Sequence, residues 1–160
     1  MPHDNLPASA AKFGRPKPDG AQLLAMARDR SIAGREALAS SVATMVATGG
    51  EAFGAAEKQL SGDILRTLIR DVERSVRAAL AANLAASAAA PRDVIISLAN
   101  DEIEVAFMVL AESPVLTDED LKAVVVARTT GHRIAIAMRP TLSEGVADCL
   151  VETGDKEALA

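Results

Sequence analysis

Apolar residues recur at spacings of three and four between residues 60 and 80. The positions are Leu60, Ile64, Leu65, Leu68, Ile69, Val72, Val76 and Leu80. This spacing is typical of the buried stripe of an amphipathic helix, because one helical turn takes between three and four residues. Asp71 interrupts the run, and aspartate favours the N-cap of a helix. We therefore predict two helices, with Asp71 as the cap of the second.

A helical pattern also covers the chain before this segment, beginning at Ala21. Ser31 precedes further apolar residues at helical spacing, so a second helix is predicted to start there with serine as its N-cap. The pair Gly49-Gly50 is expected to end that helix. We expect these two helices to form a hairpin that either caps the rest of the chain or pairs with a second copy.

One short segment occurs twice, 26 residues apart: Leu110–Thr117 aligns without a gap on Ile136–Ser143. Both copies have the pattern of a helix end, a proline that stops the helix, a leucine that packs the turn, and a hydroxyl residue that caps the next helix. The prolines are Pro114 and Pro140. The pattern predicts a repeated unit in which two helices are joined by a turn.

Earlier junctions follow the same order. Asp71 and Asp101 are 30 residues apart, and Pro91 opens a helix between them after an alanine-rich linker. These spacings are within the range of repeats made of two helices. One such pair cannot bury its own apolar face, so neighbouring pairs must stack, and about three are needed for a stable array.

The fold class predicted from these patterns is all-α, with stacked helical pairs preceded by a hairpin. Residues 1–19 are expected to be a flexible arm rich in proline and basic residues. Residues 20–58 are assigned to the hairpin or a dimerisation segment, and residues 59–160 to the repeats. Gly154–Leu159 is similar to the beginning of another helix, so the repeats are expected to continue in a longer parent protein.

Several segments carry a resemblance to a known family. They are Ser61–Arg66, Asp71–Glu73, Val76–Arg77, Ala90–Val94, Leu98–Val105, Ser113–Leu116, His132–Arg133 and Ile136–Ala137. On these segments the chain resembles an uncharacterised alphaproteobacterial family, domain of unknown function 2336, with HEAT-like or leucine-rich-variant helical repeats. The resemblance implies a HEAT-like right-handed solenoid and brings no catalytic motif with it. The sequence departs from it at Phe107-Met108, where a more polar face is expected.

Composition agrees with helices and argues against nucleic acid as a partner. Hydrophobic residues make up 49% of the chain and aromatic residues only 2%, so the apolar mass is alanine, leucine, valine and isoleucine. The net charge is −5, with both signs interleaved along the chain. Such a chain has neither a large basic face for phosphates nor exposed aromatic rings for base stacking.

The single cysteine, Cys149, excludes a disulfide within the chain. The N-terminal residues lack the basic and apolar pattern of a signal peptide, and no stretch is apolar enough to cross a bilayer. We therefore expect a cytoplasmic protein without membrane insertion, in which Cys149 is a buried packing residue.

No group of residues has the pattern of a catalytic or metal centre. The chain has two histidines, and His3 lies in the predicted arm, so no cluster has the spacing of a zinc site. The glycines at positions 49–54 lack the spacing of a phosphate-binding loop. Acidic residues such as Asp118, Glu119 and Asp120 are explained by the start of a helix, where negative charge is favoured. We expect no enzyme activity, metal or cofactor.

His132 is the only histidine within residues 20–160. The proline alignment makes it equivalent to Val76 and Ala106, in a column of positions predicted to point inward. One interpretation is a partly buried imidazole whose nitrogens bind backbone or carboxylate groups. The other is a phosphate-accepting histidine of a signalling phosphotransfer module, which requires an exposed ring.

The next column of the alignment holds Arg77, Phe107 and Arg133, which are predicted to lie side by side along the stack. Arginine suits forked contacts with carboxylates and phenylalanine suits an anchor, so the column is a candidate partner-binding face. The alternative is a solvated or inter-repeat face. Further candidates near the column are Arg74, Arg128 and Arg139.

The functional hypothesis from sequence is a non-enzymatic scaffold or adaptor for protein–protein interaction in bacterial signalling or regulation. Its partner would be another protein, with a homodimer through residues 21–58 as a further option. The alternative is a phosphotransfer module acting through His132.

Overall fold

Residues 20–158 are described by the structure, a computed structural model, and they contain nine α-helices, one short 3-10 helix and no strand. The elements are α1 (Gly20–Arg28), α2 (Ile32–Gly49), η2 (Gly50–Ala52), α3 (Ala55–Leu68), α4 (Arg74–Leu84), α5 (Arg92–Ala99), α6 (Ile103–Glu112), α7 (Asp118–Ala127), α8 (Thr130–Ala137) and α9 (Glu144–Ala158). The all-α fold class is confirmed for this part of the chain. The predicted arm at residues 1–19, with His3, lies outside the described residues.

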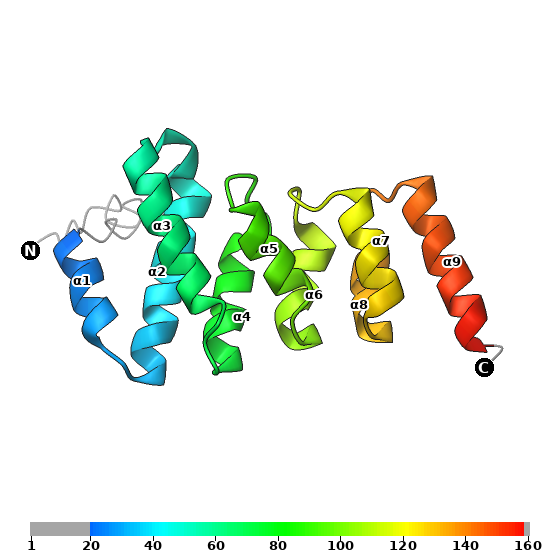
Figure 1. Cartoon of the computed structure of the whole chain (residues 1–160), viewed down its shortest axis with the longest axis horizontal. Helices are drawn as coiled ribbons and strands as arrows, with labels where there is room; N and C mark the ends of the chain where they lie inside the picture. Colours follow the sequence, from blue (N-terminus) through cyan, green and yellow to red (C-terminus); the bar gives the residue numbers. More distant parts are fainter. Residues whose placement is uncertain (1–19, 159–160) are drawn as a thin grey trace, which may run out of the picture.

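The helices lie side by side along the long axis of the molecule (Figure 1). The even-numbered helices up to α8 form one row, in which α2 packs against α4, α4 against α6 and α6 against α8. The helices α3, α5 and α7 cover one side of this row: α3 packs on α2 and α4, α5 on α4 and α6, and α7 on α8 and α9. Each helix therefore buries its apolar side against its neighbours.

Buried apolar side chains form one continuous cluster from Ala39 in α2 to Val146 in α9. The largest fully buried side chains are Leu65, Leu80, Leu84, Ile95, Leu98, Leu110 and Ile136. Full burial of one leucine or isoleucine contributes about 1.5–3 kcal/mol. The second helix, α2, thus shares a core with the helices that follow it.

Several predicted helix ends are confirmed. The Ser31 hydroxyl accepts a hydrogen bond from the Gly34 backbone N–H at 3.0 Å, so Ser31 is the N-cap of α2, which ends at Gly49. Thr117 is the N-cap of α7 and forms a capping box with Asp120, in which each side chain binds the other residue's backbone N–H. These local contacts satisfy N–H groups that a helix start leaves without a partner.

Pro114 and Pro140 occupy matching turns, as the alignment predicts. Pro114 lies between α6 and α7, and Pro140 lies between α8 and α9. Leu116 and Leu142 pack against the core beside them. The Ser143 hydroxyl accepts a hydrogen bond from the backbone of α9 at 3.2 Å, which is the predicted capping role.

Three predictions about single segments were wrong. The N-cap of α4 is Glu73, because the Asp71 carboxylate lies in the preceding loop, where it accepts the Glu73 N–H and binds a guanidinium of α2. Val72 is 88% exposed in the same loop and Leu60 is 64% exposed, so neither belongs to the buried stripe. Residues 154–158 extend α9, since a glycine inside a helix costs only about 1 kcal/mol.

Candidate functional site

The column of positions predicted to point inward is buried. Val76 and Ala106 are 0% exposed and His132 is 3% exposed, on the contacting helices α4, α6 and α8. The proline alignment therefore gives the correct rotational setting of these helices. The column next to it lies at the border between the core and the solvent.

The His132 imidazole joins the start of α8 to the loop before α6. Its Nε2 lies 2.8 Å from the backbone oxygen of Asp101, and its Nδ1 lies 2.8 Å from the Thr129 hydroxyl. A carbonyl oxygen only accepts, so Nε2 carries the hydrogen of its bond to Asp101. These are the contacts of a satisfied, buried imidazole. The phosphoacceptor hypothesis requires an exposed ring, which His132 does not have.

Arg77 is fixed by contacts within the chain. Its Nε and Nη2 donate to the Asp101 carboxylate at 2.7 and 3.1 Å, and its Nη1 donates to the Asp71 backbone oxygen at 2.7 Å. The hydrogen bond with Asp101 is the largest cause of a raised Arg77 pKa. The side chain is 13% exposed. Arg77 is therefore a tie between α4 and the loop before α6.

Arg35 repeats this arrangement one helix earlier in the row. Its Nε and Nη2 donate to the Asp71 carboxylate at 2.7 and 3.3 Å, and its Nη1 donates to the Arg30 backbone oxygen at 2.6 Å. Burial raises the Asp71 pKa, but hydrogen bonds from the Glu73 N–H and from Arg35 outweigh it, so the pKa is lowered overall. Each arginine donates back to its own loop and forward to the next loop.

Sequence reasoning missed these ties, although a signal for them is present. An aspartate precedes an arginine by six residues at Asp29/Arg35 and again at Asp71/Arg77. Asp29 accepts the N–H of the residue two positions on, as Asp71 does. A search for this pair, combined with the junction spacing, would have indicated that the arginines bind the chain itself.

The helices α3, α5 and α7, which cover the row, contain similar but more exposed ion pairs. Arg66 in α3 donates to Asp93 at 2.6 Å, and Arg92 in α5 donates to Asp120 at 2.8 Å. The arginine side chains are 43% and 49% exposed. Exposed ion pairs contribute little to stability, so we expect these pairs to stabilise the fold less than the more buried pairs of Arg35 and Arg77 do.

Phe107 and Arg133 continue the column on α6 and α8. Phe107 packs half-buried against the core, where α4 has its arginine. Arg133 donates to the backbone oxygens of Val125 at 2.9 Å and Arg128 at 3.1 Å, and it forms an ion pair with Glu157. The column thus lies on adjacent helices as predicted, but both of its guanidinium groups are used within the chain.

Arg139 closes the C-terminal end of α6 from the end of α8. Its Nη1 donates to the Leu110 backbone oxygen at 2.6 Å, and its Nη2 donates to the Ser113 backbone oxygen at 2.7 Å. Burial lowers the pKa of this guanidinium, and the charge of Asp118 opposes the shift. Terminal carbonyls of a helix favour a cation, so Arg139 is an interhelical cap.

Arg74 and Arg128 lie at the surface and make weaker contacts. Arg74 donates to Glu102 at 3.2 Å, with both side chains more than half exposed. Arg128 donates to the Asn100 side-chain oxygen at 3.2 Å. Of the arginines singled out from sequence, these two are the most available to another molecule.

The solvent-facing side of α6 and α8 carries an apolar patch. Met108 is 41%, Ile134 53% and Met138 61% exposed. Glu104 and Glu112 lie one turn before and one turn after Met108 on α6 and are exposed. We call these five residues the α6–α8 patch. Sequence reasoning noted Met108 only as a departure from a polar face, because it treated the neighbouring column as the binding surface.

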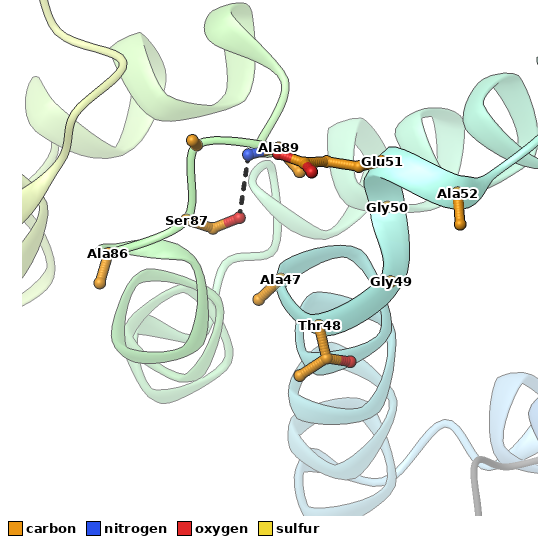
Figure 2. A pocket seen from close by; sticks show the side chains of 10 residues that line it. Ala47, Thr48, Gly49, Gly50, Glu51, Ala52, Ala86, Ser87 and Ala89 are labelled. Atoms are coloured by element: carbon orange, nitrogen blue, oxygen red, sulfur yellow. Dashed lines mark hydrogen bonds between the residues drawn. The ribbon is translucent and has the colours of Figure 1, made fainter.

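A hollow of about 430 Å³ lies between the end of α2, η2 and the loop from α4 to α5 (Figure 2). Figure 2 shows that its lining consists mainly of glycine and alanine, with Glu51 as the charged side chain. The Ser87 hydroxyl in this hollow accepts the Ala89 N–H at 3.2 Å.

A smaller apolar groove lies between α1, α2 and α3. It is lined by Leu23, Val42, Met45, Phe53, Glu57, Leu60, Ser61 and Ile64. Leu60 borders this groove, which explains its exposure. Most of the lining lies in residues 20–58, which the sequence assigns to a hairpin or dimerisation segment, and that assignment stays a prediction.

Metal and membrane features were sought in residues 20–158. No group of three or more His, Cys, Asp or Glu side chains in this range could hold a metal ion. None of the helices there combines the length and the apolar character needed to span a bilayer. Cys149 is half-buried and packs against the core, so it is less buried than predicted.

Comparison with known proteins finds a match to a family model over the C-terminal helices. Neither a curated protein nor a solved structure matches the chain. The matching segment, residues 105–160, contains most of α6 and the whole of α7, α8 and α9 as described here. It includes both proline turns and the α6–α8 patch apart from Glu104. Over this segment the chain matches the family described as an uncharacterised protein conserved in bacteria, DUF2336, which is the family that the sequence resembles.

Proposed function

We propose that this protein is a non-enzymatic scaffold or adaptor, built as a HEAT-like right-handed solenoid, that binds another protein in the bacterial cytoplasm. The observation that carries the proposal is the row of α2, α4, α6 and α8, in which each helix packs on the next. A row of this kind leaves one side of every helix facing outward, and such extended faces are the binding surfaces of helical-repeat proteins.

The repeated polar ties support the solenoid part of the proposal. Arg35 and Arg77 each join their helix to the loop that precedes the next helix of the row. A contact that recurs in the same place of successive helical pairs is expected when the pairs are copies of one unit. The matching turns at Pro114 and Pro140 support the same unit further along the chain.

The use of polar groups in the interior supports a binding role over a catalytic one. Among the described residues, every buried side-chain nitrogen and oxygen has a hydrogen-bond partner. His132, Arg77 and Arg139 are each engaged with loops or helix ends. Catalytic groups are commonly held in a cleft with capacity left for a substrate. The side chains that stay free here lie on the outer surface.

A capture experiment tests the proposal. The full chain is immobilised, exposed to extract of its source bacterium, and compared with Met108→Asp and with the control Val126→Asp. Val126 is 69% exposed on α7, a helix outside the row, so both variants place a charge at an exposed apolar position. We expect a captured protein that free chain displaces, that Met108→Asp loses, and that Val126→Asp retains. Absence of a displaceable protein, or equal loss in both variants, would overturn the proposal.

Changing Arg77, Phe107 and Arg133 together is less informative than these single changes. Both arginines tie neighbouring helices, so their loss alters the fold as well as the surface. Met108 and Val126 are exposed apolar side chains and do not tie one helix to another. Circular dichroism of each variant verifies that its helix content equals that of the wild type.

A further inference from the structure

The helices α6 and α8 run parallel, and each end of α6 lies beside the corresponding end of α8. At their N-terminal ends, a Cβ on Gly131 would lie 3.0 Å from the Ile103 side chain. At their C-terminal ends, Arg139 binds the backbone oxygens of Leu110 and Ser113. Equal burial at equivalent positions shows that the two helices also have the same rotational setting. Their exposed residues therefore belong to one continuous face.

On this face the apolar side chains of the α6–α8 patch gather. Met108 and Ile134 are equivalent positions of the two helices, and Met138 lies one turn after Ile134. Methionine is flexible and polarisable and adapts to the surface of a partner, so this trio forms an apolar platform that can accommodate another side-chain surface.

The exposed charges next to Met108 on α6 are acidic. Glu104 and Glu112 lie on either side of Met108 along α6. The Glu104 carboxylate is 3.6 Å from Arg74, whereas Glu112 forms no ion pair or side-chain hydrogen bond within residues 20–158. Carboxylates at the rim repel phosphates, which argues against nucleic acid and anionic lipid and favours lysine or arginine on the occupant.

The occupant must also satisfy its own backbone. Residues 20–158 contain no strand, so an extended peptide finds no sheet edge to which its N–H and C=O groups could bind. A helix forms its backbone hydrogen bonds internally and presents apolar side chains at spacings of three and four. On α4 the equivalent positions are Ala78, which is half-buried, and Ala82, which is exposed, so the side chains there are small and leave room for a helix.

We propose that the α6–α8 patch binds a basic amphipathic helix of a partner protein. This inference rests on the proposed function and adds the chemical class of the partner to it. The apolar stripe of the partner helix covers Met108, Ile134 and Met138. Lysine or arginine next to the stripe lies against Glu112.

Three synthetic peptides of about 18 residues, long enough to hold a helix, test the proposal on the full chain. The first has a leucine stripe flanked by lysine, the second has the same stripe flanked by glutamate, and the third has serine in the stripe with the lysines kept. Fluorescence anisotropy measures their affinities. We expect saturable binding of the first peptide, and binding that is weaker by about tenfold or more for each of the other two.

Variants of the chain locate the binding. Ile134→Ser with Met138→Ser is expected to weaken the lysine-flanked peptide about tenfold or more, because two anchors are lost. The control, Val126→Ser with Val151→Ser, removes apolar residues of α7 and α9 that are at least as exposed, and it is expected to leave affinity unchanged. Glu112→Gln is expected to reduce the preference for the lysine-flanked peptide over the glutamate-flanked one.

Three results would overturn the proposal: no binding of the first peptide, equal affinity for the third peptide, or equal losses in the patch and control variants. None of them bears on whether the immobilised chain captures a protein from the extract. A displaceable captured protein combined with failure of the peptides would therefore reject the partner class and keep the scaffold function. Capture failure rejects the scaffold function itself.

Discussion

The Arg77 guanidinium donates two hydrogen bonds to the Asp101 carboxylate, at 2.7 and 3.1 Å, and so ties α4 to the loop before α6. The backbone oxygen of the same aspartate accepts a hydrogen bond from His132, which belongs to α8. One loop residue therefore contacts the helices on both sides of α6. This geometry explains how short helices, each too weak to be stable alone, keep a fixed order along the row.

Loss of the Arg77 guanidinium should weaken the whole row. Arg77→Ala is expected to lower the free energy of unfolding by about 2 kcal/mol, because charge-assisted hydrogen bonds to two half-buried partners are lost. Urea unfolding followed by circular dichroism measures the change. The matched control is Arg128→Ala at the surface, for which we expect a change within about 0.5 kcal/mol. Equal effects of the two substitutions would show that the contacts of Arg77 contribute no more to the unfolding free energy than those of Arg128.

Asp71 should make stability depend on pH in the acid range. Its folded-state pKa is below the ordinary value of 3.8, so the unfolded chain takes up the proton first as the pH falls. The contribution is complete above about pH 5 and is lost as the pH falls through 3.8 towards the folded-state pKa.

The comparison with Asp71→Asn isolates this contribution. Wild type is expected to exceed the variant in unfolding free energy by a constant amount between about pH 5 and pH 7, and the difference should shrink below that range. The lowered pKa values of Asp93 and Asp120 affect both proteins and cancel in the difference. A difference that stays constant down to about pH 3 would contradict the assignment.

His132 should stabilise the folded chain and should accept no phosphoryl group. His132→Phe keeps an aromatic ring but leaves the Asp101 backbone oxygen without its donor, so we expect a loss of about 1–3 kcal/mol in unfolding free energy. Wild-type chain incubated with phosphorylated receiver domains is expected to take up no label, because the ring is 3% exposed. Label on wild type that is absent from His132→Gln would restore the phosphotransfer hypothesis.

Arg139 should be replaceable by neither alanine nor lysine. Its forked group reaches two carbonyl oxygens at the end of α6, whereas lysine is a single point of charge. We expect a loss of about 2 kcal/mol in unfolding free energy for Arg139→Ala, and an intermediate loss for Arg139→Lys. Faster hydrogen exchange in the last turn of α6 would locate the effect. Full stability of the lysine variant would show that a positive charge alone is enough to stabilise the C-terminal end of α6, without the forked hydrogen bonds.

The helices and their rotational setting could be predicted from sequence because both depend on local patterns. Apolar spacing identifies a helix, and a proline turn fixes the register of the helices that flank it, so Val76, Ala106 and His132 were correctly aligned. The cap of α4 was misplaced because Asp71 has a second role, as acceptor for Arg35 of another helix. Contacts between distant loops and helices are not contained in local periodicity.

The candidate binding face was harder to predict for the same reason. Sequence alone cannot tell a guanidinium that binds a partner from one that binds a loop of its own chain, and Arg77 and Arg133 are of the second kind. The apolar residue after the column, Met108 or Ile134, became a candidate only when its exposure was known.

The position of the bound partner is the most direct test of the account. Residues 20–158 contain four methionines: Met26 in α1, Met45 in α2, Met108 in α6, and Met138 directly after the last residue of α8. Their methyl groups can be labelled and followed by NMR while the captured partner is added. The account predicts that the signals of Met108 and Met138 shift and those of Met26 and Met45 do not. Shifts confined to Met26 and Met45 would contradict it.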